Sequence, residues 1–238
     1  MEATQNRNII LLTQICKRFG WLDALQGIDL QVKPGECIAL LGQNGAGKTT
    51  LLKTIAALIA PTSGQVQIQG QNPRQARSAI KRQIGFAGHQ TFLYGGLTAE
   101  ENMRFYGRLY SLESLPERIE QVLQTVGLRH RRNDRVSTLS SGMQQRLSIA
   151  RAILHAPPIL LLDEPFAGLD LGFTEKLQEL IAKLNANRTT ILLSTHDLNL
   201  ALDLCDRLVL LRNGQLQIDC APNQLPPEQW AAYLKGTA

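Results

Sequence analysis

The sequence predicts an α/β fold with a parallel sheet as its core, an antiparallel β layer packed against that core and an inserted α-helical subdomain. Three observations favour this fold. A short apolar run leads through a glycine-rich loop into a helix pattern, continuous apolar runs recur later in the chain, and residues 99–135 change to a polar pattern of helical spacing. The 238 residues can form one large domain or two small ones around a sizeable core.

Strand and turn patterns alternate in the first third of the chain. Strands are predicted at residues 10–15, 28–32, 37–41 and 65–69. A turn at 33–36 separates the second strand from the third. Residues 50–60 have the pattern of an apolar helix that Pro61 ends. This order predicts a strand–loop–helix unit that packs against an antiparallel layer.

The rest of the chain predicts helices and buried strands. Apolar residues recur at helical spacing in the insertion, at Met103, Tyr106, Leu109, Ile119, Leu123 and Val126. The next helix passes through Leu147, Ala150 and Leu154 and stops at Pro157 and Pro158. Residues 159–162 and 190–194 are apolar runs typical of parallel strands buried on both faces. A short amphipathic helix is predicted at 228–234 as a packing element. We therefore predict a single domain over 1–238, with a core near 1–98 and 136–238 and a helical insertion near 99–135.

Composition narrows the classes of function. Hydrophobic residues make up 44% of the chain and charged residues 19%, as in ordinary globular proteins, and no apolar run approaches the roughly 18 residues of a membrane span. The polar start has no apolar segment typical of a secretory signal, so we expect any membrane role to come through a partner. The four cysteines and four histidines have no metal-ligand spacing, which favours free thiols in a reducing compartment.

The net charge of +5 is mild and only weakly favours anionic partners. Four arginines cluster near the end of the insertion, at Arg129, Arg131, Arg132 and Arg135. A solvated face is the favoured interpretation of this cluster, and a patch that faces phospholipid or a partner is the alternative.

The glycine-rich loop fits the phosphate-binding pattern G-x-x-x-x-G-K-[ST] and lies between a predicted strand and a predicted helix. Its residues are Gly42, Gln43, Asn44, Gly45, Ala46, Gly47, Lys48 and Thr49. Glycines allow the backbone to wrap a phosphate, and the helix that begins near Lys48 adds its positive end. We expect Lys48 to reach the β- and γ-phosphates of ATP and Thr49 to bind Mg²⁺. The pattern predicts a P-loop NTPase with a RecA-like sheet.

Two acids and a histidine end apolar strands. Asp163 and Glu164 follow the run at 159–162, and His196 follows the run at 190–194. Parallel strands deliver such residues to the carboxyl edge of the sheet, where phosphates bind. Asp163 suits the Mg²⁺ shell, and Glu164 suits a catalytic role in polarising the attacking water. His196 is placed to contact the γ-phosphate and to hold Glu164 and water in line.

Residues 139–170 read LSSGMQQRLSIARAILHAPPILLLDEPFAGLD and complete the pattern. With the phosphate loop and His196, this block closely resembles the nucleotide-binding domain of ABC transporters, over nearly the whole chain. The resemblance implies that two such domains close over two ATP molecules, as a homodimer or a paired ATPase, and drive integral membrane subunits from the cytoplasmic face of the membrane. It implies nucleotide contacts from the loop residues, Thr50 and Phe19, with Trp21 a less favoured stand-in for Phe19. It also implies contacts from one subunit to the partner's ATP through Ser140, Ser141, Gly142 and Asp170.

Two departures from the family pattern concern the site. The family usually has Leu-Ser-Gly-Gly-Gln where this chain has Leu-Ser-Ser-Gly-Met, so Ser141 and Met143 put the tightness of dimer closure in question. The family's glutamine that contacts Mg²⁺ and water aligns with His89, whereas a shift of one residue restores Gln90. Both residues stay open as Mg²⁺ contacts.

The sequence from Gly88-His89-Gln90 to Tyr110 resembles the ATPase of haem exporters used in cytochrome c maturation. An exporter of drugs or lipids and an importer are the alternatives within transport. A soluble ABC ATPase that acts on nucleic acid, the ribosome or iron–sulfur assembly is a rival class. We expect no nucleic-acid partner, because the chain has no coiled-coil insertion, zinc module or second ATPase domain. A small-molecule kinase would leave residues 139–170 unexplained.

Overall fold

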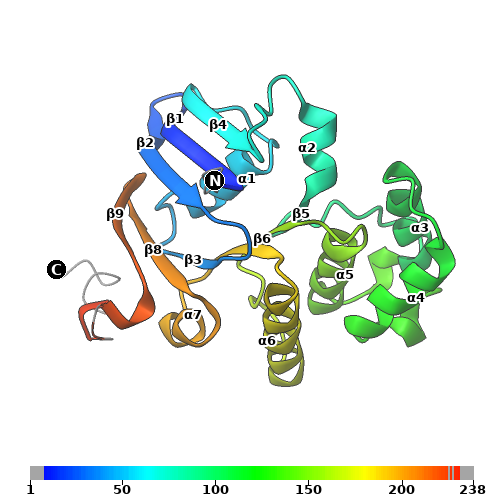
Figure 1. Ribbon diagram of the computed structural model, residues 1–238. Helices are drawn as coiled ribbons and strands as arrows, with labels where there is room; N and C mark the ends of the chain where they lie inside the picture. Colours follow the sequence, from blue (N-terminus) through cyan, green and yellow to red (C-terminus); the bar gives the residue numbers. More distant parts are fainter. Residues whose placement is uncertain (1–7, 225, 227, 231–238) are drawn as a thin grey trace, which may run out of the picture.

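Two sheets organise the chain in the computed structural model, which describes residues 8–224, 226 and 228–230 (Figure 1). The core sheet contains, in order, β5 (Ile84–Ala87), β6 (Ile159–Asp163), β7 (Thr190–Ser194), β3 (Cys37–Leu41), β8 (Arg207–Arg212) and β9 (Gln215–Cys220). The smaller sheet contains, in order, β2 (Leu22–Val32), β1 (Ile10–Phe19) and β4 (Ser63–Ile68). Pairing in the core sheet is parallel except between β8 and β9, and pairing in the smaller sheet is antiparallel. The predicted α/β fold is confirmed.

The core sheet is covered on both faces, as the continuous apolar runs predicted. Every residue of β3, β6 and β7 is buried. Ile38 and Leu40 belong to a hydrophobic cluster with the smaller sheet and α1 (Lys48–Ile55), whereas Ala39 and Leu41 belong to a cluster with helices of the opposite face. Those helices include α5 (Ser141–Ile153) and α6 (Leu171–Ala186).

The hairpin of β1 and β2 is longer than the two strands predicted. Pairing continues as far as Phe19 opposite Leu22, with register shifts that include one between Leu12 and Ile15. The added part of the first strand contains two consecutive charged residues, Lys17 and Arg18, which interrupt any apolar alternation. The hairpin therefore carries Phe19 to the tip of the smaller sheet.

Helix α1 ends at Ile55 and not at residue 60, so the predicted C-terminal boundary was wrong. Ala57 adopts a left-handed conformation with φ of 54°, and its N–H donates to the Thr54 carbonyl. The Leu58 N–H donates to the Lys53 carbonyl. This pair of bonds is a Schellman motif, which ends a helix without requiring proline.

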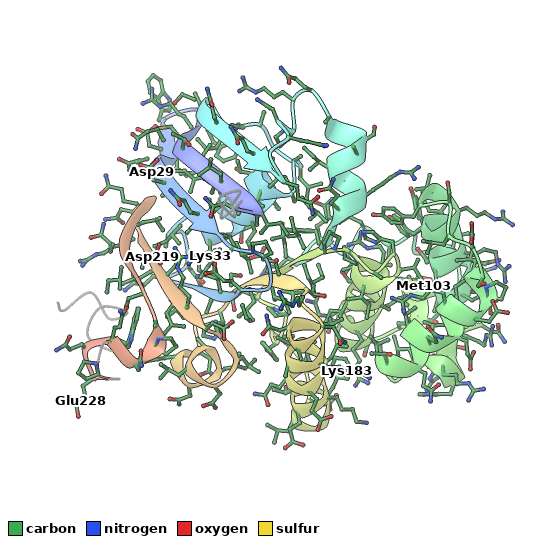
Figure 2. All side chains as sticks on the ribbon, in the orientation of Figure 1. Asp29, Lys33, Met103, Lys183, Asp219 and Glu228 are labelled. Atoms are coloured by element: carbon green, nitrogen blue, oxygen red, sulfur yellow. The ribbon has the colours of Figure 1, made fainter. Side chains whose placement is uncertain are left out.

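The inserted segment contains α3 (Ala99–Leu109), α4 (Leu115–Thr125) and a short 3₁₀ turn, η1 (Arg129–Arg131). A capping box joins Thr98 and Glu101 at the start of α3, and each backbone N–H is satisfied by the other's side chain. Met103 is fully buried where α3 meets its neighbours (Figure 2). Figure 1 shows these helices at the side of the molecule away from β1 and β2.

Three arginines of the cluster, Arg129, Arg131 and Arg132, bind carboxylates of their own chain. Arg132 contacts Glu100 at 2.7 Å and Glu120 at 3.0 Å, Arg129 also pairs with Glu120, and Arg131 pairs with Asp134. The Arg132 guanidinium lowers the pKa of Glu100, and the partly exposed pairs are each worth little alone. These bonds tie residues 129–134 to α3 and α4, and a solvated face stays the favoured interpretation of the cluster.

The remaining elements connect or flank the core. Helix α2 (Arg77–Gln83) was not predicted, because its sequence is polar and has no regular apolar spacing. The others are α7 (Leu198–Leu204), η2 (Val136–Thr138) and η3 (Pro222–Gln224). The predicted helix at 228–234 lies mostly outside the described residues, but Trp230 is fully buried. No helix among the described residues is long and apolar enough to cross a bilayer.

The four cysteines carry free thiols, as predicted. Cys37 Sγ, at the start of β3, lies 3.5 Å from Cys205 Sγ at the end of α7. The hydrogen bond to Cys37 and burial raise the pKa of the Cys205 thiol far above its usual range. The Cys205 thiol is therefore protonated, and the two buried cysteines pack as small apolar side chains.

His155, just after α5, makes acid stability testable. Its ring stacks on Tyr110 with centroids 3.8 Å apart, and burial, reinforced by the charges of Arg151 and Arg118, lowers its pKa to about 4. An unfolded histidine binds a proton below about pH 6.5 and this folded one does not, so stability falls as pH drops from 6.5 to 4. His155→Phe keeps an aromatic ring that can stack on Tyr110. Between pH 6.5 and pH 4, we expect its free energy of unfolding, measured with urea, to fall by about 3 kcal/mol less than that of the wild type.

The exposed His130 supplies the control His130→Phe, which makes the same replacement without touching the buried ring of His155. Equal pH dependence in His155→Phe and the wild type would contradict the depressed pKa.

Candidate functional site

Four segments meet at the carboxyl edge of the core sheet. They follow β3, β5, β6 and β7, which are parallel, so their ends share one edge. A Cβ added to Gly88, just after β5, would lie 3.0 Å from the Asp163 Cβ at the end of β6. The order of the strands therefore assembles the glycine-rich loop, the acids and the histidine at one place.

The glycine-rich loop depends on glycine at two crowded positions. Gly42 has φ of 145° and Gly47 has φ of 109°. An added Cβ would lie 2.4 Å from the Leu211 carbonyl oxygen at Gly42 and 2.7 Å from the Ala24 carbonyl oxygen at Gly47. Gln43, Asn44 and Gly45 are exposed, so the loop presents its backbone to solvent.

Lys48 is the first residue of α1 and is only 6% exposed. Its Nζ donates to the Gly42 carbonyl at 2.6 Å and to the Gln43 carbonyl at 3.2 Å. The nearest carboxylate oxygen is Glu164 Oε1 at 3.7 Å. The ammonium group is thus fixed inside the loop, beside the N-terminal end of α1, where an anion is favoured.

Two hydroxyls hold Asp163, which is 2% exposed. Thr49 Oγ1 and Ser194 Oγ donate to Asp163 Oδ1 at 2.9 Å and 2.8 Å. The predicted pair of Thr49 and Asp163 therefore forms one set of oxygen donors.

Glu164 follows Asp163 in a left-handed conformation with φ of 49°, an arrangement that costs about 1–3 kcal/mol for a residue other than glycine. Its N–H donates to Ser194 Oγ at 2.9 Å, and its Oε2 lies 3.0 Å from His196 Nδ1. Glu164 is 15% exposed at its side chain, whereas His196 is 74% exposed. The turned backbone points the buried carboxylate toward Lys48 and His196 together.

The donor chemistry of this edge fits ATP with Mg²⁺. Glu164 Oε1 is buried without a hydrogen-bond partner, which leaves an acceptor ready for a water molecule. Mg²⁺ prefers hard oxygen ligands and is usually held by one or two protein groups together with substrate phosphates, as the Thr49 and Asp163 pair permits. No group of three or more acidic, histidine or cysteine side chains that could hold a metal occurs in the described part of the chain.

Ser140 and Ser141 are exposed at the start of α5. Ser140 caps the helix, with its Oγ accepting from the Met143 N–H at 3.3 Å. A Cβ on Gly142 would lie 3.1 Å from the Gly168 carbonyl oxygen, so the helix start touches the Gly-Leu-Asp turn.

Arg146 joins that helix to the same turn. Its guanidinium donates to Asp170 Oδ2 at 2.7 Å and lies over the Phe173 ring at 4.4 Å. Asp170 caps α6, and the hydrogen bond from the Phe173 N–H, with the charge of Arg146, lowers the pKa of Asp170. The residues predicted to contact the partner's ATP, Ser140, Ser141, Gly142 and Asp170, therefore lie close together.

The remaining predicted residues lie at three places. Phe19 is 48% exposed at the hairpin tip, with Lys17 Nζ 4.8 Å from its ring centroid, whereas Trp21 is fully exposed. Thr50 is half-buried in α1. His89 and Gln90 are both exposed after β5, beside the end of β6.

Ser194 and Arg146 were missed from the sequence as parts of the site. Ser194 pairs in register with Asp163, so a hydroxyl ending the strand beside β6 was the available indication. Nothing in the sequence alone indicates the pairing of Arg146 with Asp170, because it depends on how α5 packs beside the turn.

A P-loop nucleoside triphosphatase is defined by the features that meet at this sheet edge. They are a phosphate-binding loop, a pair of oxygen donors, and a carboxylate beside a histidine. The sequence model described as ABC transporter matches residues 25–167, which is more than half of the chain. The chain belongs to this family, and it is an ATPase subunit coupled to transport.

Named relatives support this assignment. The ABC transporter ATP-binding protein NatA of Bacillus subtilis is 37% identical over 215 residues, covering 87% of each chain. The bacitracin transport ATP-binding protein BcrA of Bacillus licheniformis is 38% identical, covering 87% of this chain and 68% of that protein. A dimeric post-hydrolysis state of the ATP-binding cassette MJ0796, bound to ADP and Pi, has a TM-score of 0.83 at 31% identity, covering 90% of this chain and 98% of that one.

Proposed function

We propose that the carboxyl edge of the core sheet is the hydrolytic site and that Glu164 is its catalytic base. The linked positions of Lys48, Glu164 and His196 carry this proposal, since Glu164 lies 3.7 Å from the lysine and 3.0 Å from the histidine. Lys48 and the loop backbone bind the β- and γ-phosphates, and Thr49 and Asp163 hold Mg²⁺, which when bound neutralises phosphate charge. Glu164 orients and polarises the attacking water, and His196 keeps that carboxylate in line.

Two copies of the chain, or one copy and a paired ATPase, close face to face over two ATP molecules. Ser140, Ser141 and Gly142 then meet the γ-phosphate bound by the partner, and Asp170 lies at the boundary. The exposure of the two serines supports this arrangement, as does Leu171, which is 85% exposed beside Asp170. The related cassette MJ0796 has been solved as a dimer, which also supports this arrangement. Phe19 stacks on adenine, and His89 or Gln90 contacts Mg²⁺ and water.

A membrane subunit docks where the inserted helices meet the core. Tyr94, Phe105 and Leu109 are exposed there, at 49%, 37% and 57%. Tyr94 and Phe105 pack edge to face, with ring centroids 5.0 Å apart. A cavity of about 490 Å³ beside them is lined by residues such as Phe92 and Arg151. This surface would hold the chain peripherally at the cytoplasmic face of the membrane.

Haem export for cytochrome c maturation is the cargo assignment that we propose within transport. It rests on the sequence from Gly88-His89-Gln90 to Tyr110, which forms much of the docking surface. Export of a drug or lipid is the second candidate, and it is supported by relatives named for bacitracin transport and for probable multidrug transport.

Phe105→Asp tests the docking surface and the cargo together. In a strain that lacks this gene, we expect the wild-type chain to restore covalent haem in c-type cytochromes and Phe105→Asp to fail. The purified variant should keep its basal ATPase rate, because Phe105 lies outside the hydrolytic site. Restoration by Phe105→Asp would contradict the docking surface. If the wild-type chain instead restores resistance to an antimicrobial compound and leaves c-type cytochromes unchanged, the cargo is a drug or lipid and not haem.

A further inference from the structure

Ser194 has a position that packing alone does not explain. It is the last residue of β7, it pairs in register with Asp163, and it is fully buried. Its hydroxyl donates to Asp163 Oδ1 at 2.8 Å and accepts from the Glu164 N–H at 2.9 Å. A single hydroxyl thus bonds to both acids of the site.

The Glu164 N–H needs this acceptor. Strand β6 ends at Asp163, and Glu164 turns into the left-handed conformation with φ of 49°, so its N–H leaves the sheet ladder. A buried N–H without an acceptor is unfavourable, and Ser194 Oγ supplies one. The same bond fixes the turn that directs the Glu164 carboxylate.

The Asp163 carboxylate also needs a fixed orientation. Ser194 and Thr49 both donate to Oδ1, so loss of the serine hydroxyl would leave Thr49 as the one hydroxyl that donates to this oxygen within the described residues. Thr49 is itself proposed as a Mg²⁺ ligand. The Asp163 carboxylate therefore needs a second group, other than Thr49, to hold its orientation.

We propose that Ser194 is a positioning residue that orients Asp163 toward Mg²⁺ and Glu164 toward the attacking water. This inference rests on the roles proposed for the two acids. The Ser194 hydroxyl would thereby affect two properties at once: the Mg²⁺ requirement, through Asp163, and the rate of hydrolysis, through Glu164.

Ser148 offers a matched control. It is also a fully buried serine, in α5, but its Oγ has no hydrogen-bond partner in the described structure. Replacement of either serine by alanine removes the same atom from a buried position. Only Ser194→Ala removes a contact with the acids.

The experiment compares Ser194→Ala, Ser194→Thr and Ser148→Ala in the full chain. We expect Ser194→Ala to raise the Mg²⁺ concentration for half-maximal hydrolysis about tenfold and to lower kcat about tenfold or more, the loss expected for a hydrogen bond to a charged group. Thermal stabilisation by a non-hydrolysable ATP analogue should require correspondingly more Mg²⁺. Ser194→Thr keeps the hydroxyl and should restore both properties, and Ser148→Ala should resemble the wild type.

A wild-type Mg²⁺ dependence and kcat in Ser194→Ala would overturn the inference. Equal losses in Ser194→Ala and Ser194→Thr, with a lowered Tm in both, would also overturn it and assign the residue to packing. Asp163→Asn separates this failure from that of the proposed site. If Asp163→Asn keeps the wild-type Mg²⁺ dependence, the metal site itself is wrongly assigned.

Discussion

Glu164→Gln should abolish ATP turnover while leaving ATP binding intact. Glutamine keeps the size of the side chain and can still lie beside His196, but it cannot accept a proton from the attacking water. General bases contribute about 10²–10⁴-fold to rates, so we expect kcat to fall by about that factor. Phosphate release measured at saturating ATP checks the rate, and equilibrium binding of a fluorescent ATP analogue checks affinity.

The same variant should accumulate as an ATP-bound dimer, because closure no longer leads to hydrolysis and reopening. Size-exclusion chromatography with ATP and Mg²⁺ should show twice the monomer mass, and the wild type should show less of this species. Glu175, an exposed glutamate of α6, gives the control Glu175→Gln, for which we expect wild-type turnover. Wild-type hydrolysis by Glu164→Gln would refute its assigned role.

Lys48→Met should weaken ATP binding as well as hydrolysis. The Lys48 ammonium is buried in the loop and held by the Gly42 and Gln43 carbonyls, so its position is fixed before a phosphate arrives. A hydrogen bond to a charged group is worth about 1.5–3 kcal/mol, which corresponds to about a tenfold to 150-fold loss of affinity. Titration of a fluorescent ATP analogue measures this loss.

Lys53→Met is the matched control, because Lys53 lies in the same helix but in its last turn. It should bind ATP like the wild type and differ little in Tm. Unchanged affinity in Lys48→Met, or an equal loss in both variants, would mean that the specific position of the Lys48 charge does not contribute.

Sequence patterns predicted the part of the fold in which local chemistry and buried strands agree. The continuous apolar runs of β6 and β7 require burial on both faces, and they led directly to a parallel sheet and to acids at its edge. Polar α2 and the extension of the β1–β2 hairpin lacked such patterns. The end of α1 depends on backbone bonds around Ala57, which no residue type there makes obvious.

The candidate site also contains residues that the sequence predicted and a residue that it did not. Lys48, Thr49, Asp163 and Glu164 follow from local motifs, whose spacing carries their chemistry. Ser194 acts through its register with a strand that is distant in sequence, so its contact appears only once the order of the strands is known.

The ion pair between Arg146 and Asp170 has a consequence for communication between two bound nucleotides. Arg146 belongs to α5, the helix that Ser140 caps, and Asp170 caps α6 and is proposed to lie at the subunit boundary. A shift of the serine toward the partner's ATP would therefore pull the boundary aspartate with it. In the proposed dimer each subunit would sense the occupancy of the opposite site mechanically, and the two hydrolysis events would not be statistically independent.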